Sequence, residues 1–86
     1  MSINNLEEAV ATTKKFTSKP SNEELLSLYA YYKQATEGDN NEERPGGFDF
    51  KAAAKYNAWA KLKGTSKSEA EQGYIALVRK LSTQYI

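Results

Sequence analysis

The sequence predicts an all-α protein built from four helices. Apolar residues recur at the i, i+3, i+4, i+7 spacing of an amphipathic helix along the chain. Two segments begin with a serine followed three residues later by a glutamate, the capping-box pattern of a helix start. Glycine and proline residues fall mainly between the segments, and no segment reads as a strand. At 86 residues, the chain is expected to form one small domain, residues 1–86, in which a helical bundle buries a thin core.

The first helix is expected from about Asn4 or Asn5 to Lys15. Acidic residues lie in its first turn and lysines in its last, as the helix dipole favours. Its apolar stripe consists of Leu6, Ala9, Val10, Thr13 and Phe16, of which Thr13 is the weakest member.

The second helix follows Pro20, which ends any continuation of the first. The Ser21/Glu24 pair predicts its start. The helix is expected from about Asn22 to Thr36, and Gly38 is a natural residue for its C-terminus.

A third helix is expected after Asp49, a good N-cap, and extends to about Lys63. The Ser66/Glu69 capping box predicts a fourth helix from about Lys67 to Thr83. Gly73 lies inside it and costs roughly 0.8–1 kcal/mol of helix propensity relative to alanine. Either another helix approaches closely there or the sequence tolerates the loss.

The segment from Glu37 to Asp49 is expected to be a long loop, because its glycines, asparagines and proline cannot build a regular element. Loops of this length are often functional. The alternative is a simple connection that Phe48 and Pro45 pin to the helices.

Composition excludes several classes of function. The chain has no cysteine and no histidine, so it lacks a thiolate nucleophile, the commonest general base and the commonest zinc ligands. Twelve basic and eleven acidic residues do not make the basic surface that nucleic-acid binding needs. No apolar run reaches the ~20 residues of a membrane span, and the first residues lack the pattern of a signal peptide. We therefore expect a cytoplasmic binding protein without a metal, a cofactor or catalytic activity.

The most informative stretch contains Tyr29, Tyr32 and Lys33, which share one face of the second helix. Aromatic rings can stack on a purine base, and a tyrosine hydroxyl and a lysine ammonium can donate to phosphate oxygens. The alternative is that both tyrosines belong to the core and that the lysine reaches past them to water.

Lys55 lies along an apolar seam with Ala58, Trp59 and Leu62 on the third helix, and Lys51 lies one turn before it. A lysine in this position either extends past the indole to solvent or directs its ammonium at an anion in a groove.

The chain resembles the acyl-CoA-binding protein family from about Leu6 to Tyr85. The resemblance rests on Tyr32-Lys33-Gln34-Ala35-Thr36-x-Gly38-Asp39, on Arg44-Pro45-Gly46 and on Lys55-x-x-Ala58-Trp59-x-x-Leu62-Lys63-Gly64. It implies a four-helix bundle with up-down-down-up topology and a bowl on the surface for the ligand.

The resemblance also implies roles for particular residues. Tyr29, Tyr32 and Lys33 match the positions that hold the adenine and its phosphate. Lys55 matches a lysine at the 3′-phosphate, Tyr74 a tyrosine at the coenzyme A head, and Lys14 a basic position near the phosphates. Lys51 is a less secure further contact. Leu26 and Ala54 are expected near the acyl chain.

The sequence departs from the family pattern at three positions. Tyr56 stands where the family often has tryptophan, Thr13 replaces an apolar residue, and Gly73 precedes the tyrosine of the fourth helix. These changes concern packing more than the binding of the head group.

The leading hypothesis is a monomeric carrier and pool former for medium- and long-chain acyl-CoA esters, which it hands to acyl-CoA-using enzymes without stable insertion into a membrane. An alternative is a helical interaction module whose groove accepts a partner helix. A weaker one is a protein that binds single-stranded nucleic acid, against which the near-neutral charge argues.

Overall fold

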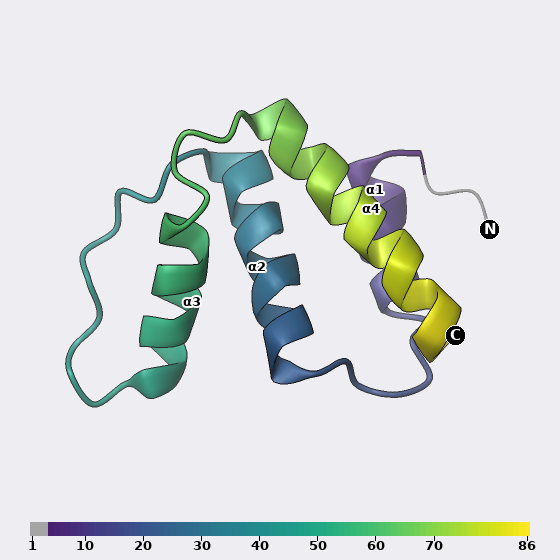
Figure 1. Ribbon diagram of the computed structural model, residues 1–86, viewed down its shortest axis with the longest axis horizontal. Coiled ribbons are helices and arrows are strands. Elements are labelled where there is room, and N and C mark those ends of the chain that lie inside the picture. Colours follow the sequence, from purple (N-terminus) through teal and green to yellow (C-terminus); the bar gives the residue numbers. More distant parts are fainter. Residues whose placement is uncertain (1–3) are drawn as a thin grey trace.

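The computed structural model describes residues 4–86, which form four helices: α1 (Leu6–Thr13), α2 (Asn22–Glu37), α3 (Phe50–Ala60) and α4 (Lys67–Tyr85). Helix α2 occupies the middle, with α3 beside it and α4 crossing it on the other side, while α1 packs against α4 (Figure 1). Helices α2 and α3 run in the same direction, and α1 and α4 run in the opposite one. The predicted up-down-down-up topology is confirmed.

The bundle is flat, with principal dimensions of 40 × 27 × 15 Å. A helix with its side chains is about 10–12 Å across, so the short dimension is little more than one helix. As a result α3 packs against α2 alone among the helices.

The predicted helix starts are confirmed. The Ser21/Glu24 and Ser66/Glu69 capping boxes both form, with each serine side chain accepting from the glutamate N–H and each glutamate accepting from the serine N–H. Asp49 caps α3 by accepting from the N–H of Ala52 at 3.0 Å. The Asn5 side chain likewise caps α1. These four caps satisfy backbone donors that have no partner within a helix.

Two predicted helix ends are too late in the chain. Helix α1 ends at Thr13 rather than Lys15, and α3 ends at Ala60 rather than Lys63. In both cases the next amides bond to carbonyls three residues back, as in Lys15 N–H to Thr12 O and Lys63 N–H to Ala60 O. Such bonds tighten the last turn, and the chain leaves the α-helical path.

Helix α4 continues to Tyr85, two residues beyond its predicted end at Thr83. Tertiary contacts of Tyr85 hold this last turn. Its ring lies 5.9 Å from that of Phe16, its hydroxyl donates to Glu24 Oε1 at 2.8 Å, and its carbonyl accepts from the Thr17 hydroxyl. The sequence of the helix itself does not predict these partners.

The hydrophobic core comes from α1, α2 and α4. It consists of Ala9, Leu28, Tyr74, Ile75, Val78 and Leu81. Helix α3 adds Trp59, which is also buried but is surrounded by polar partners described below.

Gly73 lies where α4 meets α2 most closely. A Cβ atom at this position would stand 2.6 Å from Cε1 of Tyr31, a distance that no real contact tolerates. The first of the two explanations for this glycine is therefore correct, since a ring of α2 occupies the space that a side chain would need.

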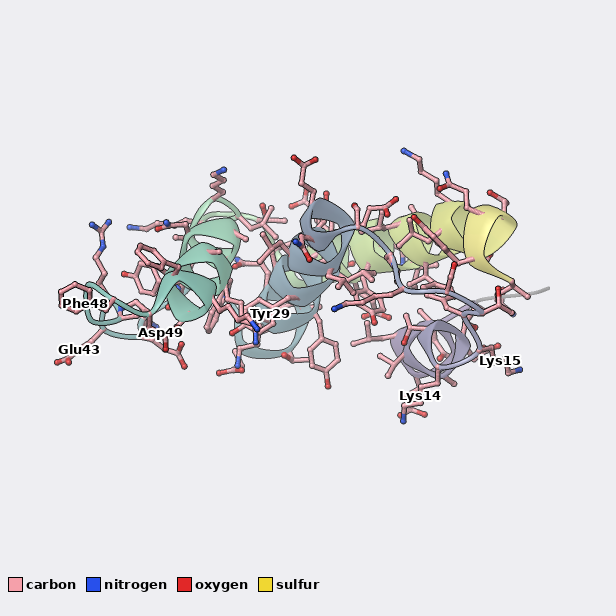
Figure 2. The ribbon with its side chains drawn as sticks, turned by 90° about the horizontal axis from the view of Figure 1, so that it is seen from below. Lys14, Lys15, Tyr29, Glu43, Phe48 and Asp49 are labelled. Carbon is pink, nitrogen blue, oxygen red and sulfur yellow. The ribbon has the colours of Figure 1, made fainter. Side chains whose placement is uncertain are left out.

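The loop between α2 and α3 is not pinned by Phe48, contrary to the alternative drawn from the sequence. The Phe48 side chain is 96% exposed and points outward from the loop (Figure 2). The loop is tied instead by Asn40, whose side chain donates to Tyr56 O at 3.4 Å, and by Arg44, whose guanidinium lies 6.0 Å from the Tyr56 ring centre. A solvated phenylalanine leaves apolar area unburied, so it contributes little to the placement of this loop.

Candidate functional site

Two adjacent cavities share residues of α2 and form what we call the trough. Their volumes are about 700 and 440 Å3. Both have Lys19, Leu25 and Tyr29 in their walls, so they meet at these three residues.

The wider part of the trough lies among α1, α2 and α4. Tyr32 of α2 and Tyr74 of α4 form part of its wall, with ring centres 6.0 Å apart and planes tilted by 56°. Tyr32 is 41% exposed, so it is not the core residue that the alternative interpretation proposed. Its ring and hydroxyl are available to a molecule in the trough.

The narrower part lies between α2 and α3. Its walls combine apolar side chains with three ammonium groups and include no acid: Lys19, Asn22, Leu25, Leu26, Tyr29, Phe50, Lys51, Ala54 and Lys55. Helical spacing explains this arrangement on α3, because residues 50, 54 and 51, 55 are pairs four apart. An anion with a hydrocarbon tail matches such a lining in both charge and polarity.

Helices α2 and α3 are bridged by two reciprocal contacts between a lysine and an aromatic ring. The Lys55 ammonium of α3 lies 5.5 Å from the centre of the Tyr29 ring on α2. The Lys33 ammonium of α2 lies 4.9 Å from the Trp59 ring on α3. In each helix the two partners are four residues apart, so parallel helices bring both contacts into register. The two predicted phosphate-binding lysines thus face the same seam between α2 and α3.

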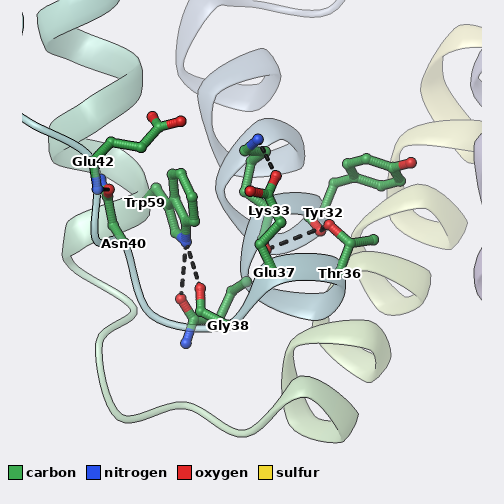
Figure 3. A network of polar contacts seen from close by, with 9 residues as sticks. Tyr32, Lys33, Thr36, Glu37, Gly38, Asn40, Glu42 and Trp59 are labelled. Carbon is green, nitrogen blue, oxygen red and sulfur yellow. Dashed lines mark hydrogen bonds and ion pairs between the residues drawn. The ribbon is translucent and has the colours of Figure 1, made fainter.

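Lys33 has a second partner in Glu37, with which it forms an ion pair one turn along α2 (Figure 3). The hydrogen bond to Glu37 is the main reason that the pKa of Lys33 is raised above its ordinary value, and the nearby charge of Glu37 adds to the effect. In this arrangement the ammonium rests between the carboxylate and the indole ring, and Lys33 is absent from the wall of the trough.

Trp59 is fixed by polar groups from α2 and from the residue that ends it. Its indole N–H donates to Gly38 O at 2.8 Å and to Gln34 Oε1 at 3.1 Å. Gly38 has φ +83°, a backbone conformation that favours glycine and turns its carbonyl out of the helix. The ring under Lys33 is therefore held in place by the end of α2.

Asp39 and Gln34 connect this tryptophan to the turn before α4. Asp39 Oδ1 accepts from Gly64 N–H and from Gln34 Nε2, both at 2.9 Å, and Gln34 Nε2 also donates to Thr65 O. The hydrogen bond from Gly64 and that from Gln34 lower the pKa of the Asp39 carboxyl. We call Gln34, Gly38, Asp39 and Trp59 the polar junction.

Tyr74 joins the trough to the core. Burial raises the pKa of its hydroxyl, and a hydrogen bond with Thr13 opposes that effect. Thr13 is itself in the wall of the wider part of the trough. The departure of Thr13 from the apolar stripe of α1 is explained by this position, since it faces the trough rather than the core.

The structure brings most of the predicted site residues to the trough. Those in its walls are Leu26, Tyr29, Tyr32, Lys51, Ala54, Lys55 and Tyr74. Lys33 lies beside it in the ion pair with Glu37. Lys14 follows the last residue of α1, and its exposed side chain extends away from that helix (Figure 2).

Several wall residues are absent from the site that the sequence predicts, and two of them bear on ligand binding. Phe50 is 78% exposed and forms part of the narrower wall, where its position four before Ala54 could have signalled a shared face. Lys19 lies between α1 and α2 and is in the wall of both parts of the trough. Nothing in the local sequence distinguishes Lys19 from a solvated lysine, because the fold of the chain brings it there.

Within residues 4–86, no group of three or more acidic, histidine or cysteine side chains is placed to hold a metal ion. None of the helices in that range has the length and apolar character of a membrane span.

Comparisons with known proteins agree on one family. Residues 4–78 match the family described as acyl-CoA-binding protein. The acyl-CoA-binding protein of Dictyostelium discoideum is 56% identical over 92% of this chain and 94% of its own length. That of Saccharomyces cerevisiae is 51% identical over 92% of this chain and 91% of its own length.

Solved structures show the same fold. The crystal structure of Oryza sativa acyl-CoA-binding protein 2 superposes with a TM-score of 0.87 at 40% identity, covering 92% of this chain and 88% of the other. The solution structure of the yeast acyl coenzyme A binding protein gives a TM-score of 0.73 at 51% identity, covering 92% of both chains.

Proposed function

The chain belongs to the acyl-CoA-binding protein family, and on that premise we propose that it is a carrier and pool former for medium- and long-chain acyl-CoA esters. The observation that carries the proposal is the narrower part of the trough. Three lysines and Tyr29 stand beside an apolar wall there, with no acid among them. Coenzyme A esters combine a phosphorylated purine nucleotide with a hydrocarbon tail. The lysines and Tyr29 are complementary to the nucleotide, and the apolar wall is complementary to the tail.

For the head group, we propose that Tyr29 and Tyr32 contact the adenine and that Lys55 contacts its 3′-phosphate. A phosphate monoester carries about −1.5 to −2 charges near neutral pH, so more than one ammonium can bind it. Tyr74 and Lys51 are further proposed contacts. Lys33 and Lys14 belong to the same proposed set, but each has to change its side-chain conformation to reach a ligand in the trough.

For the tail, we propose that Leu26 and Ala54, joined by Phe50, line the path of the acyl chain. All three are in the same wall. Burying them against a hydrocarbon removes apolar surface from water, which is the general source of affinity for lipids.

The proposed mechanism is reversible binding without catalysis, in keeping with the names of the relatives, which describe binding proteins. We further propose that residues 1–86 act as one domain, that the protein works as a cytoplasmic monomer without stable membrane insertion, and that it exchanges its ligand with acyl-CoA-using enzymes. No role in binding nucleic acid is proposed.

Calorimetric titration with a series of acyl-CoA esters tests the carrier proposal directly. Each fully buried methylene contributes ~0.8 kcal/mol, and a tenfold change in affinity is about 1.4 kcal/mol. Affinity is therefore expected to rise by up to roughly fourfold per methylene until the apolar wall is filled. Equal affinities for free coenzyme A and for a long-chain ester would exclude the proposal.

The head-group assignment is tested by Lys55→Ala. The variant is expected to weaken binding of an acyl-CoA ester more than binding of its 3′-dephospho form. Lys61→Ala is the matched control, because Lys61 follows the same helix but lines a separate cavity that shares only Leu26 and Ala54 with the trough. An equal loss for both ligand forms would place Lys55 away from the 3′-phosphate.

The tail assignment is tested by Phe50→Ala. This change is expected to weaken binding of a long-chain ester and to leave free coenzyme A unaffected. Phe48→Ala removes an equally large ring two residues earlier that is absent from the trough walls, so it should change neither. Native mass spectrometry of the purified protein also separates this proposal from a groove for a partner helix, since a retained acyl-CoA and a bound polypeptide differ in mass.

A further inference from the structure

The two lysines at the seam between α2 and α3 are not equally available to a ligand. Lys55 is exposed, lines the trough and lies over the Tyr29 ring. The Lys33 side chain is 21% exposed and contacts both the Trp59 ring and the Glu37 carboxylate. To contact a phosphate in the trough, the Lys33 ammonium must either break its ion pair with Glu37 or move together with the Glu37 carboxylate.

Glu37 has no evident role in building the fold. It is the last residue of α2, where the helix dipole disfavours a negative charge, and the helix has no basic residue in its last turn. Its side chain is half exposed, takes no part in the polar junction and pairs with Lys33. Glu42 approaches the same region from the loop, on the other side of Trp59 (Figure 3). The contact that this acid makes within the described residues is therefore the one with Lys33.

We propose that Glu37 is a specificity-determining residue that competes with the ligand's phosphate for the Lys33 ammonium. This inference rests on the proposed function, because it requires that acyl-CoA occupies the trough. Glu37 lowers the affinity for phosphate-bearing ligands in two ways. In the free protein, Glu37 pairs with the Lys33 ammonium. In the complex, the Glu37 carboxylate is left unpaired near the phosphate.

The geometry favours competition over positioning. A residue that positions Lys33 for the ligand would hold the ammonium in the wall of the trough, but the ion pair holds it over Trp59 instead. The raised pKa of Lys33 agrees with a carboxylate that binds the charged ammonium directly. Lys55 then makes the first contact with the phosphate, and Lys33 joins only when the phosphate displaces Glu37.

The test compares Glu37→Gln with the wild-type protein by calorimetric titration of coenzyme A and 3′-dephospho coenzyme A. We expect Glu37→Gln to bind coenzyme A roughly two- to fivefold more tightly, the effect of breaking one partly exposed ion pair. The gain for the dephospho form should be smaller. Glu23→Gln is the matched control, because it removes the same charge from the other end of α2, where Glu23 lines the separate cavity.

A double-mutant cycle isolates the pair. In a Lys33→Met background, Glu37→Gln should give a smaller gain in affinity for coenzyme A, because the competition for the ammonium no longer exists and only the repulsion between carboxylate and phosphate remains. Fluorescence adds a readout that a merely structural role would not move. Trp59 is the single tryptophan, so a change of its emission on coenzyme A binding reports the departure of Lys33 and should disappear in Lys33→Met.

Weaker binding in Glu37→Gln would overturn the inference by making Glu37 a positioning residue. An equal gain in Glu23→Gln would also overturn it, since the effect would then come from net charge. In either case the wild type still binds acyl-CoA, so the proposed function stands. A wild-type protein that binds neither coenzyme A nor a long-chain ester would instead remove the proposed function itself.

Discussion

The two sides of α2 are held by different physical means. On one side, α2 joins α1 and α4 in an apolar core in which Val78 and Leu81 are fully buried. On the other side, α2 meets α3 through the polar junction, where Gln34 is fully buried and bonded to the Trp59 indole. Apolar contact is tolerant of small displacements, whereas hydrogen bonds depend on distance and angle.

This difference assigns separate tasks to the two regions. The core sets most of the stability, because apolar burial is the dominant favourable term in folding. The polar junction sets where α3 stands relative to α2 and hence the shape of the narrower part of the trough. Its loss should therefore release α3 while the packing of α1, α2 and α4 survives.

The largest effect is expected for Leu81→Ala in the core. Removing a fully buried leucine side chain destabilises proteins by about 2–5 kcal/mol, from the lost burial and the cavity left behind. Urea unfolding measures this loss. Leu62→Ala, a half-buried leucine just after α3, should cost less, and an equal cost would contradict the claim that the core dominates.

Trp59→Phe tests the polar junction and should come next in size. The change removes the indole N–H and leaves Gln34 Oε1 and Gly38 O without their donor, which costs about 1–3 kcal/mol. Hydrogen exchange should show faster amide exchange in α3, with α4 little affected.

Tyr56→Phe is its control, because it removes a hydroxyl from the same helix without touching the junction. If Trp59→Phe accelerated exchange equally in α3 and α4, the two regions would be one cooperative unit rather than two.

Gly73→Ala examines how tightly α4 meets α2. Crowding against the Tyr31 ring is expected to lower the free energy of unfolding by about 1–3 kcal/mol, and the better helix propensity of alanine offsets about 1 kcal/mol of this loss. A net loss of about 0–2 kcal/mol is expected in thermal or urea unfolding. Gly46→Ala, where a Cβ meets nothing within 4 Å, provides the comparison and should be neutral or slightly stabilising.

The smallest effect near neutral pH is expected for Asp39→Asn. The folded-state pKa of Asp39 lies below its ordinary value of 3.8, so its ionised carboxylate stabilises the fold above that pH. This contribution is lost as the pH falls through the folded-state value. The variant should thus be less stable than wild type at neutral pH, and the difference should shrink in acid.

Thermal unfolding followed from neutral pH down to below 3.8 measures this convergence. Glu43→Gln, which removes an acid of the same loop outside the polar junction, serves as its control. A constant difference between Asp39→Asn and wild type across the range would mean that the carboxylate's charge is irrelevant to the junction.

The predicted helix starts and the observed ones agree because their causes are local. In the capping boxes at Ser21 and Ser66, donor and acceptor lie three residues apart, so the pattern is visible in the chain itself. The face that unites Tyr29, Tyr32 and Lys33 follows from helical spacing in the same way. Family resemblance added the topology and the roles of the site residues, which spacing alone does not contain.

Where the expectation was wrong or incomplete, the cause lies in distant parts of the chain. The exposure of Phe48 and the place of Lys19 in the trough wall depend on how segments assemble. Two further contacts also link residues of different helices: the close approach of Gly73 to Tyr31 and the position of the Lys33 ammonium over the Trp59 ring.

The sequence by itself therefore determined the four helices, their starts and the aromatic and basic face of α2, because interactions within one turn depend only on neighbours. The tertiary structure decided which lysines line the trough and which one is withheld by Glu37. Those outcomes depend on packing and electrostatics between segments that are brought together only when the chain folds.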